Sequence, residues 1–303
     1  MIAQGPETAS HRRNRRSAED WAARLPDLRT QALRIAATVA MGSHGRRRSG
    51  PGDSFWQFRP YRPGDPSRSI DWRRSAQGDR HFVREQEWQA AESFWLWLDQ
   101  SPSMQFSGAR GRHTKLDRAS VLLFAMASLL LRSGERVGLL CADRTRMIRS
   151  GPQALDHLCE MLPEQHGATG LPIAAELPRH ATVLAFSDTW TPLDAWDRRL
   201  TQLARPGVRG HIVQVIDPVE ARLTMRGRVR VEGLEGEAPV LLRRAEDLTD
   251  AYSARFAQHN ERMKTICRRL GWRFSRHATD HPPLPLLLGL HQAISIDRRS
   301  VHA

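Results

Sequence analysis

The chain has 303 residues and a mass of 34.4 kDa, with 40% hydrophobic and 26% charged residues. This length and composition indicate about two globular domains at ~150 residues each, and they exclude a fully disordered chain or a fibrous repeat. The net charge of +13, with a pI near 11.1, favours acidic partners by long-range attraction but does not identify one.

The three cysteines, Cys141, Cys159 and Cys267, lie far apart and show no CxxC spacing. This arrangement excludes a disulfide framework and a zinc ribbon. No apolar segment of the kind found in secretory signals follows the basic N-terminus. The apolar stretches 119–131 and 284–290 are far shorter than the ~20 residues of a membrane span. We therefore expect a cytoplasmic protein without a transmembrane segment.

The first predicted element is an amphipathic helix over Glu19–Met41, with a break near Pro26. A basic, glycine-rich loop follows over Gly42–Asp53. The next block, Phe55–Trp72, is rich in proline, glycine and aspartate, which predicts turns between short extended pieces. The predicted boundaries are 1–54 for the helical and irregular extension and 55–92 for this block.

From Ser93 the pattern alternates between strands and helices, which is typical of an α/β fold with a parallel sheet. Continuous apolar runs that end in polar loops predict buried parallel strands. In chain order we expect strand 94–98, helix 116–132, hairpin 137–148, helices 154–162 and 171–177, strand 182–186, helix 194–204 and strand 211–216. Residues 93–217 are therefore predicted to form a Rossmann-like, mostly parallel sheet flanked by helices.

The segment after Asp217 has a different pattern. It predicts two polar strands within 229–242 and a long charged helix over 245–270. A last strand over 272–275 and a closing helix over 285–293 follow. We expect these elements, within residues 218–303, to pack on the same domain.

Oxygen-bearing side chains follow two of the predicted buried strands. Asp99, Ser101 and Ser103 alternate after the first strand, so a turning loop can aim all three at one point. Asp188 follows a second apolar strand, and Thr169 lies on a loop between them. Loops at the carboxyl ends of neighbouring parallel strands converge on one crevice, so we expect these side chains to meet there. Such hard oxygen ligands favour Mg²⁺ or Mn²⁺ over zinc.

This pattern resembles the metal-ion-dependent adhesion site of von Willebrand factor A domains, with D-x-S-x-S, a threonine and an aspartate on three loops. The resemblance implies a von Willebrand A-like domain. It also implies that the ion is held by Asp99, Ser101, Ser103, Thr169 and Asp188, with the hydroxyls binding directly and the aspartates often through water. An acidic side chain of a protein partner would then fill an open coordination position.

A second resemblance rests on the block before the first sheet strand. Its pattern is RxYxPGDxxRxIDWxxSA, formed by Arg59, Tyr61, Pro63, Gly64, Asp65, Arg68, Ile70, Asp71, Trp72, Ser75 and Ala76. The pattern resembles the signature of the bacterial domain-of-unknown-function-58 (DUF58) proteins, with glutamine at position 77 in place of the usual arginine. These proteins are often encoded beside MoxR-type AAA+ ATPases, so the resemblance implies such an ATPase as partner.

Each pattern also has an ordinary structural interpretation. A DxSxS sequence can be a turn with helix-capping hydroxyls. The aspartates of the signature can pair with its arginines and hold an irregular segment in place, through Asp65, Asp71, Arg59, Arg62 and Arg68. Three tryptophans are expected to pack in the core rather than to form a stacking platform: Trp88, Trp95 and Trp97.

Motifs typical of enzymes are absent from the sequence. It contains no GxxxxGK[ST], GxSxG or HExxH pattern, and no activating base is suggested near Ser101. We therefore expect a non-enzymatic adaptor that captures an acidic residue of a protein partner. The alternative is an electrostatic nucleic-acid or anionic-membrane binding protein that uses the clusters Arg12–Arg16 and Arg46–Arg48.

Overall fold

The computed structural model describes residues 9–43, 55–63, 65, 67, 70–76, 78, 80–86, 91–109, 112–141, 148–164, 170–205, 207–231, 233–234 and 239–301. The chain forms two compact units. The smaller unit spans residues 43–91, and the larger one combines residues 1–42 with 92–303. Of the basic loop predicted over Gly42–Asp53, the first two residues belong to the N-terminal helix, and residues 44–53, including Arg46–Arg48, lie outside the described residues.

The smaller unit is built on an antiparallel pair of strands, β1 (Phe55–Pro60) and β2 (Phe82–Gln86). The one-turn helix α2 (Trp72–Ser75) lies between them in the chain. Its N-cap is Asp71, whose side chain accepts a hydrogen bond from the backbone N–H of Arg74 at 2.9 Å. Short extended pieces joined by turns were predicted for this block, and the described residues contain them.

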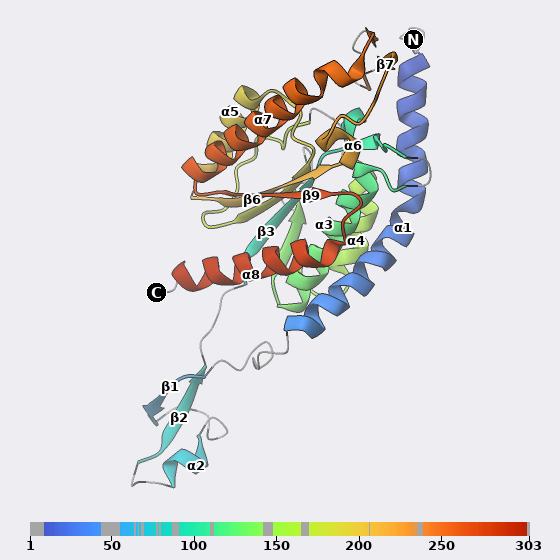
Figure 1. Ribbon diagram of the computed structural model, residues 1–303. Helices are drawn as coiled ribbons and strands as arrows, with labels where there is room; N and C mark the ends of the chain where they lie inside the picture. The colour runs from blue at the N-terminus through green and yellow to red at the C-terminus, as the bar shows by residue number, and fades with distance from the viewer. Residues whose placement is uncertain are drawn as a thin grey trace, which may run out of the picture. The chain divides into compact units, whose positions relative to one another are not determined.

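The larger unit contains a five-stranded parallel sheet (Figure 1). Its strands, in spatial order, are β4 (Arg136–Leu139), β3 (Ser93–Leu98), β5 (Thr182–Ser187), β6 (Arg209–Ile216) and β9 (Arg273–Ala278). The predicted α/β fold, a mostly parallel sheet flanked by helices, is confirmed. The fifth strand comes from the segment after Asp217, so that segment completes the sheet.

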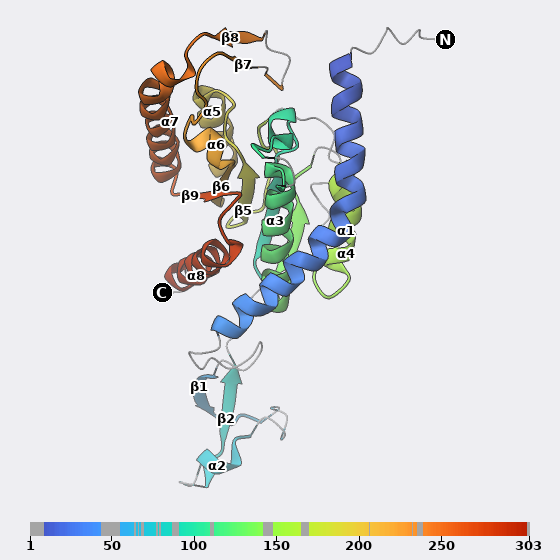
Figure 2. The same ribbon diagram turned by 45° about the vertical axis from the view of Figure 1, so that its right-hand side comes forward.

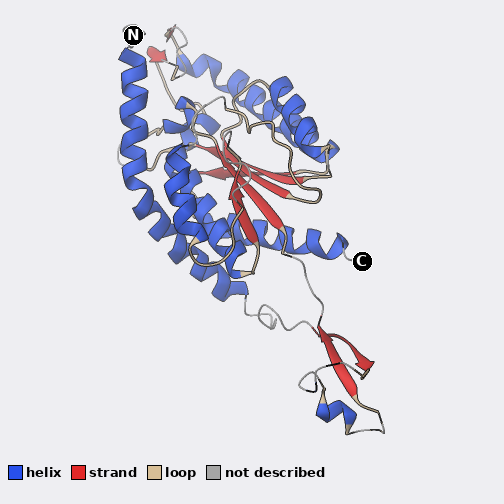
Figure 3. Ribbon diagram, turned by 180° about the vertical axis from the view of Figure 1, so that it is seen from behind, coloured by secondary structure: helices blue, strands red, loops and turns tan. Residues whose placement is uncertain are grey.

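Helices cover both faces of the sheet (Figure 3). One face packs against α3 (Lys115–Arg132), α4 (Ala154–Met161) and α8 (Pro283–Val301), and the other against α5 (Leu193–Ala204) and α7 (Thr249–Arg269). The helix α1 (Ala9–Ser43) joins the core of the first face and runs along α3 and α4 (Figure 2). Successive strand residues point to opposite faces, so Phe94 and Leu96 join the first core while Trp95 and Trp97 join the second. Both tryptophans are buried, as predicted; Trp88 lies outside the described residues.

The N-terminal helix α1 continues through Pro26, so the predicted break is wrong. Proline removes one helical hydrogen bond and crowds the preceding turn, which bends a helix rather than necessarily ending it. Figure 2 shows α1 bending as it passes along α3 and α4. Packing keeps both halves helical, because Trp21 and Leu25 before the proline and Leu28 after it are all buried in the core.

The predicted helix over 171–177 is also wrong, because this segment is irregular. Pro172 lacks a backbone donor, and Pro178 disfavours helical geometry at the residue before it. The carbonyl of Pro172 instead accepts a hydrogen bond from the Arg199 guanidinium. Its apolar residues still reach the core, where Leu177 is 6% exposed.

Among the remaining elements, the antiparallel pair β7 (Val229–Val231) and β8 (Val240–Leu242) lies within the two polar strands predicted over 229–242. The start of the helix predicted over 245–270 is a separate short helix, η4 (Ala245–Leu248). The short helices η2 (Pro102–Gln105), η3 (Leu162–Glu164) and α6 (Pro218–Ala221) were not predicted. Of the predicted hairpin over 137–148, β4 is present and Val137 bridges Arg149, while 142–147 lie outside the described residues.

Among the described helices, none is both long enough and apolar enough to cross a bilayer.

Candidate functional site

The candidate site lies where the strand order of the sheet reverses. The chain leaves β3 to build β4 on one side, and later returns to build β5 and β6 on the other side. In doubly wound sheets, ligands bind at the carboxyl ends of the strands at such a switch point. Asp99 directly follows β3 and Asp188 directly follows β5, and the backbone N–H of Asp99 donates to the carbonyl of Phe186 at 2.9 Å.

The first loop brings three of the predicted ligands together. Asp99 is 1% exposed, and its Oδ1 accepts a hydrogen bond from the backbone N–H of Ser101 at 2.9 Å. The hydroxyls of Ser101 and Ser103 lie 3.1 Å apart. Ser101 precedes the short helix η2, but its hydroxyl does not cap that helix. The D-x-S-x-S side chains therefore form one polar cluster at the end of β3, rather than the helix cap of the ordinary interpretation.

The loop after β5 is tied to this cluster. The Ser187 hydroxyl donates to Oδ2 of Asp99 at 2.6 Å and accepts the backbone N–H of Thr189 at 2.9 Å. Thr189 has φ of +62°, a left-handed conformation that is rare for a β-branched residue. Two hydrogen bonds hold Thr189 in this conformation. The side-chain amide of Gln214 donates to the Thr189 hydroxyl, and the ring of His259 contacts the Thr189 carbonyl. Such local strain is typical of functional sites.

Asp188 is held by a buried lysine. Its Oδ2 accepts a hydrogen bond from Nζ of Lys115 at 2.8 Å, and its Oδ1 accepts the backbone N–H of Trp190 at 3.1 Å. The same ammonium also contacts Oε1 of Glu220 at 2.5 Å. Lys115 is fully buried, at the first position of α3, so its charge is enclosed between the loops after β5 and β6.

The electrostatics of this site leave negative charge in excess. Burial, and then the nearby carboxylate of Asp188, raise the pKa of Asp99 to about 6. Burial also raises the pKa of Glu220 even though Lys115 opposes the shift. For Lys115, burial lowers the pKa, but Asp188 and Glu220 more than offset it and keep the ammonium charged. Asp188 and Glu220 share the ammonium of Lys115, whereas Asp99 accepts hydrogen bonds from the neutral donors of Ser101 and Ser187. This arrangement favours a further cation.

Thr169 lies outside the described residues. Its neighbour Gly170 is described, with φ of +63°. A Cβ atom at Gly170 would lie 4.0 Å from Oδ2 of Asp99 and 2.3 Å from the hydroxyl of Thr191. Gly170 thus lies beside Asp99, and its backbone approaches Thr191 too closely for a residue with a side chain.

Cation binding here would depend on hydroxyl ligands. Within the described part of the chain, no group of three or more His, Cys, Asp or Glu side chains could hold a metal ion. Asp99, Ser101 and Ser103 supply one carboxylate and two hydroxyls, a donor set suited to Mg²⁺ or Mn²⁺. Both oxygens of Asp99 and both oxygens of Asp188 already accept protein hydrogen bonds, and those of Asp188 include one from the ammonium of Lys115.

The signature block has a structural role in the smaller unit. Oδ2 of Asp65 accepts the backbone N–H of Arg62 at 2.8 Å, and Asp71 caps α2. Trp72 is 61% exposed and meets the ring of His81 edge-on. The proposed pairing of these aspartates with arginines stays a prediction, because Gly64, Arg68 and the side chain of Arg59 are outside what the structure describes.

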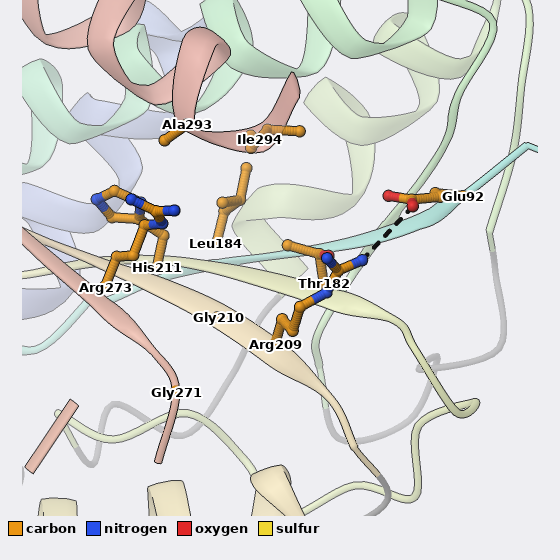
Figure 4. A pocket seen from close by; sticks show the side chains of 10 residues that line it. All are labelled: Glu92, Thr182, Leu184, Arg209, Gly210, His211, Gly271, Arg273, Ala293 and Ile294. Carbon is orange, nitrogen blue, oxygen red and sulfur yellow. Dashed lines mark hydrogen bonds and ion pairs between the residues drawn. The ribbon is translucent and has the colours of Figure 1, made fainter. Parts of the chain in front are cut away.

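The opposite, amino-terminal edge of the sheet carries a small cavity of about 20 Å³ (Figure 4). Arg209 and Glu92 form an ion pair at 3.5 Å beside it, and Ile294 of α8 contributes to its wall. A cavity of this size holds a single water molecule. It is therefore too small to be a ligand site.

Lys115 and Glu220 were not predicted from the sequence. Glu220 carries a local signal, because Asp217 and Glu220 form the capping box of α6 after a buried strand. Lys115 stands at the start of an apolar helix, where a lysine is ordinarily taken as a solvent-exposed residue of the first turn. Their pairing with Asp188 spans three distant parts of the chain, which no local pattern reveals.

Comparison with known families decides the chain's membership. Residues 57–262 match the family described as "Protein of unknown function DUF58". The chain belongs to the DUF58 family. The match begins within the signature block and extends into α7, so it includes every residue of the candidate site described above.

The DUF58 chain is also similar to uncharacterized proteins of two mycobacteria. They are Mb1516 of Mycobacterium bovis and Rv1480 of Mycobacterium tuberculosis, each 28% identical over 227 residues that cover 69% of this chain and 70% of the relative. Among solved structures, the conserved hypothetical protein BatB from Bacteroides thetaiotaomicron aligns with 13% identity over 69% of this chain and all of its own, at a TM-score of 0.42. An uncharacterized membrane-spanning protein from Vibrio fischeri aligns with a TM-score of 0.18. Neither score supports an argument about fold or function.

Proposed function

We propose that this DUF58 protein is a non-enzymatic adaptor whose site at the carboxyl edge of the sheet binds a divalent cation and, through it, a carboxylate of a protein partner. The observation that carries the proposal is the cluster of Asp99, Ser101 and Ser103 at the switch point of a parallel sheet. The cluster lies where such sheets bind ligands, and its oxygens are of the type that Mg²⁺ or Mn²⁺ prefers.

The chemistry of such a site follows from its ligands. The hydroxyls of Ser101 and Ser103 are neutral, so they hold a cation without cancelling its charge. Asp99 is the one carboxylate of this loop cluster, so a divalent ion would keep a net positive charge. When bound, the ion supplies an electrophilic centre for an incoming carboxylate. The residues of the chain position it and exclude water from its buried side, where Ser101 is 2% exposed.

The identity of the partner rests on the resemblance of the sequence to its family. We propose a MoxR-type AAA+ ATPase that presents an aspartate or glutamate to the cation. The von Willebrand A-like character of the domain belongs to the same proposal, and the placement of Asp99 and Asp188 after neighbouring parallel strands supports it.

A capture experiment tests this function. The protein is incubated in native lysate with Mg²⁺ or with EDTA, and the captured proteins are identified by mass spectrometry. We expect the ATPase to be captured with Mg²⁺, lost with EDTA and restored by added Mg²⁺. Asp99→Asn, which preserves the shape of the side chain, should lose the capture, whereas Asp247→Ala at an exposed aspartate should retain it.

The second candidate function is electrostatic binding to nucleic acid or an anionic membrane, favoured by the net charge of +13. Binding of this kind survives EDTA and Asp99→Asn but falls steeply with salt, because it depends on the release of counterions. That result, together with no cation-dependent capture, would contradict the adaptor proposal.

A further inference from the structure

Lys115 provides the site with a cation of its own. Its ammonium is fully buried and makes contacts of 2.8 Å with Asp188 and 2.5 Å with Glu220. Nζ also lies 5.9 Å from the centroid of the Phe106 ring, so an aromatic face closes part of its surroundings. Lys115 therefore forms an ion pair with Asp188, a carboxylate that a metal-binding site of the predicted type would use.

Lysine, the residue at position 115, is rare in this chain. Of its 46 basic residues, only Lys115 and Lys264 are lysines, and the rest are arginines. Arginine is the more common residue for buried ion pairs, because its planar fork binds carboxylates in two places. Lysine instead places a compact point charge on a flexible stem. The buried lysine of this arginine-rich chain thus places a compact charge on a flexible stem between two carboxylates.

The two carboxylates that hold Lys115 are not equivalent. Asp188 directly follows Ser187, whose hydroxyl donates to Oδ2 of Asp99, so Asp188 lies beside the Asp99 cluster. Glu220 lies in α6, where its Oε2 also accepts the backbone N–H of Asp217 at 3.0 Å. An ammonium that released Asp188 would retain Glu220 as a partner. The Asp188 carboxylate could then coordinate a cation at the Asp99 cluster, while Lys115 kept its ion pair with Glu220.

We propose that the Lys115 ammonium is a tethered counter-ion that competes with a divalent cation for Asp188. This inference rests on the proposed function, because it concerns the same cation site. With the ammonium on Asp188, the cation has only the ligands of the first loop. When the ammonium withdraws to Glu220, Asp188 becomes available and the cation is bound more tightly. Lys115 thereby sets the affinity of the site.

Cation titration of variants tests the competition. Lys115→Met combined with Glu220→Gln removes one positive and one negative charge, so the site keeps its net charge while Asp188 loses its competitor. We expect Mn²⁺, measured by calorimetry, to bind this variant at least tenfold more tightly than the wild type. Lys264→Met is the matched control at a surface lysine, 49% exposed, and should leave the affinity unchanged.

A second measurement on the wild-type protein does not depend on a variant that folds. Because the chain has two lysines, ¹³Cε-labelled lysine gives two side-chain resonances. Addition of Mg²⁺ should shift the Lys115 resonance as the ammonium leaves Asp188, and the Lys264 resonance should stay in place. A Lys115 resonance that does not move while calorimetry records cation binding would overturn the inference.

The outcomes separate this inference from the proposed function. If wild type and double variant bind Mn²⁺ equally and Asp99→Asn abolishes the binding, the cation site stands and the role of Lys115 is refuted. If the double variant binds while the wild type does not, the competition is supported in its strongest form. If no form of the protein binds a divalent cation at millimolar concentration, both proposals fail.

Discussion

The hydroxyl of Ser187 donates a hydrogen bond of 2.6 Å to Oδ2 of Asp99, joining two residues 88 positions apart at the ends of neighbouring strands. This bond ties the loop after β5 to the loop after β3. It also stabilises the ionised form of Asp99, because a hydroxyl donor favours the carboxylate over the acid.

Ser187→Ala should therefore change both the stability and the ionisation of the site. The substitution leaves Asp99 without this donor and the buried N–H of Thr189 without its acceptor. We expect a loss of about 1–3 kcal/mol in the free energy of unfolding, measured with urea. The pKa of Asp99, followed by ¹³C NMR of its carboxyl, should rise above about 6. A pKa that stays in place would show that this hydrogen bond has no electrostatic role.

Asp99→Asn should stabilise the protein when divalent cations are removed. A carboxyl whose pKa is raised on folding binds its proton more tightly in the folded state, so stability is lost as pH rises from 3.8 to about 6. The cost at pH 7.5 is at most about 3 kcal/mol. In EDTA we expect the variant to unfold at higher urea than the wild type, with the difference vanishing near pH 4. Mg²⁺ should stabilise the wild type alone. A wild type more stable than the variant in EDTA at every pH would contradict this account.

His277 should make the protein sensitive to acid. Its side chain is buried, and burial followed by the charges of Arg118 and His281 lowers its pKa to about 4. Because the unfolded chain takes up a proton near pH 6.5 and the folded one does not, stability is present above pH 6.5 and lost as pH falls towards 4. His277→Gln should remove about 3 kcal/mol of this pH dependence in urea unfolding. His113→Gln, at a half-exposed histidine, is the control. An unchanged pH profile in His277→Gln would exclude the buried histidine as the cause.

Trp21 should anchor α1 to the larger unit. It is 2% exposed, and its indole N–H donates to the hydroxyl of Ser120 in α3 at 3.1 Å. Trp21→Ala should cost about 3–5 kcal/mol in the free energy of unfolding, from lost burial and the resulting cavity. Trp21→Phe retains most of the apolar contact and should cost less. Equal losses in the two variants would mean that the indole hydrogen bond, not the ring, supports the helix.

The parts of the fold with local signals were predicted, and those that depend on distant packing were not. The strand ending at Leu98 was evident from its apolar run, and the polar residues from Asp99 onward marked the ligand edge. The helix expected over 171–177 fails because its apolar residues pack as an irregular segment between two prolines. A helix that continues through Pro26 could not be told from one that breaks there, because the packing that keeps both halves helical comes from distant parts of the chain such as α3.

The same limit applies to the candidate site. Asp99, Ser101 and Ser103 are neighbours in sequence, so their spacing suffices to predict a cluster. The partner of Asp188 could not be predicted, because Lys115 lies 73 positions earlier and Glu220 is 105 positions from Lys115. Only the folded sheet brings them together.

The late position of β9 in the chain has a consequence for biosynthesis. β6 is complete at Ile216, but its pairing partner on that side begins only at Arg273. While the ribosome makes the intervening segment, β6 is an open edge whose backbone groups can pair with another nascent chain. A premature stop codon after Asp217 would make this edge permanent, so truncated products of the gene should accumulate as aggregates.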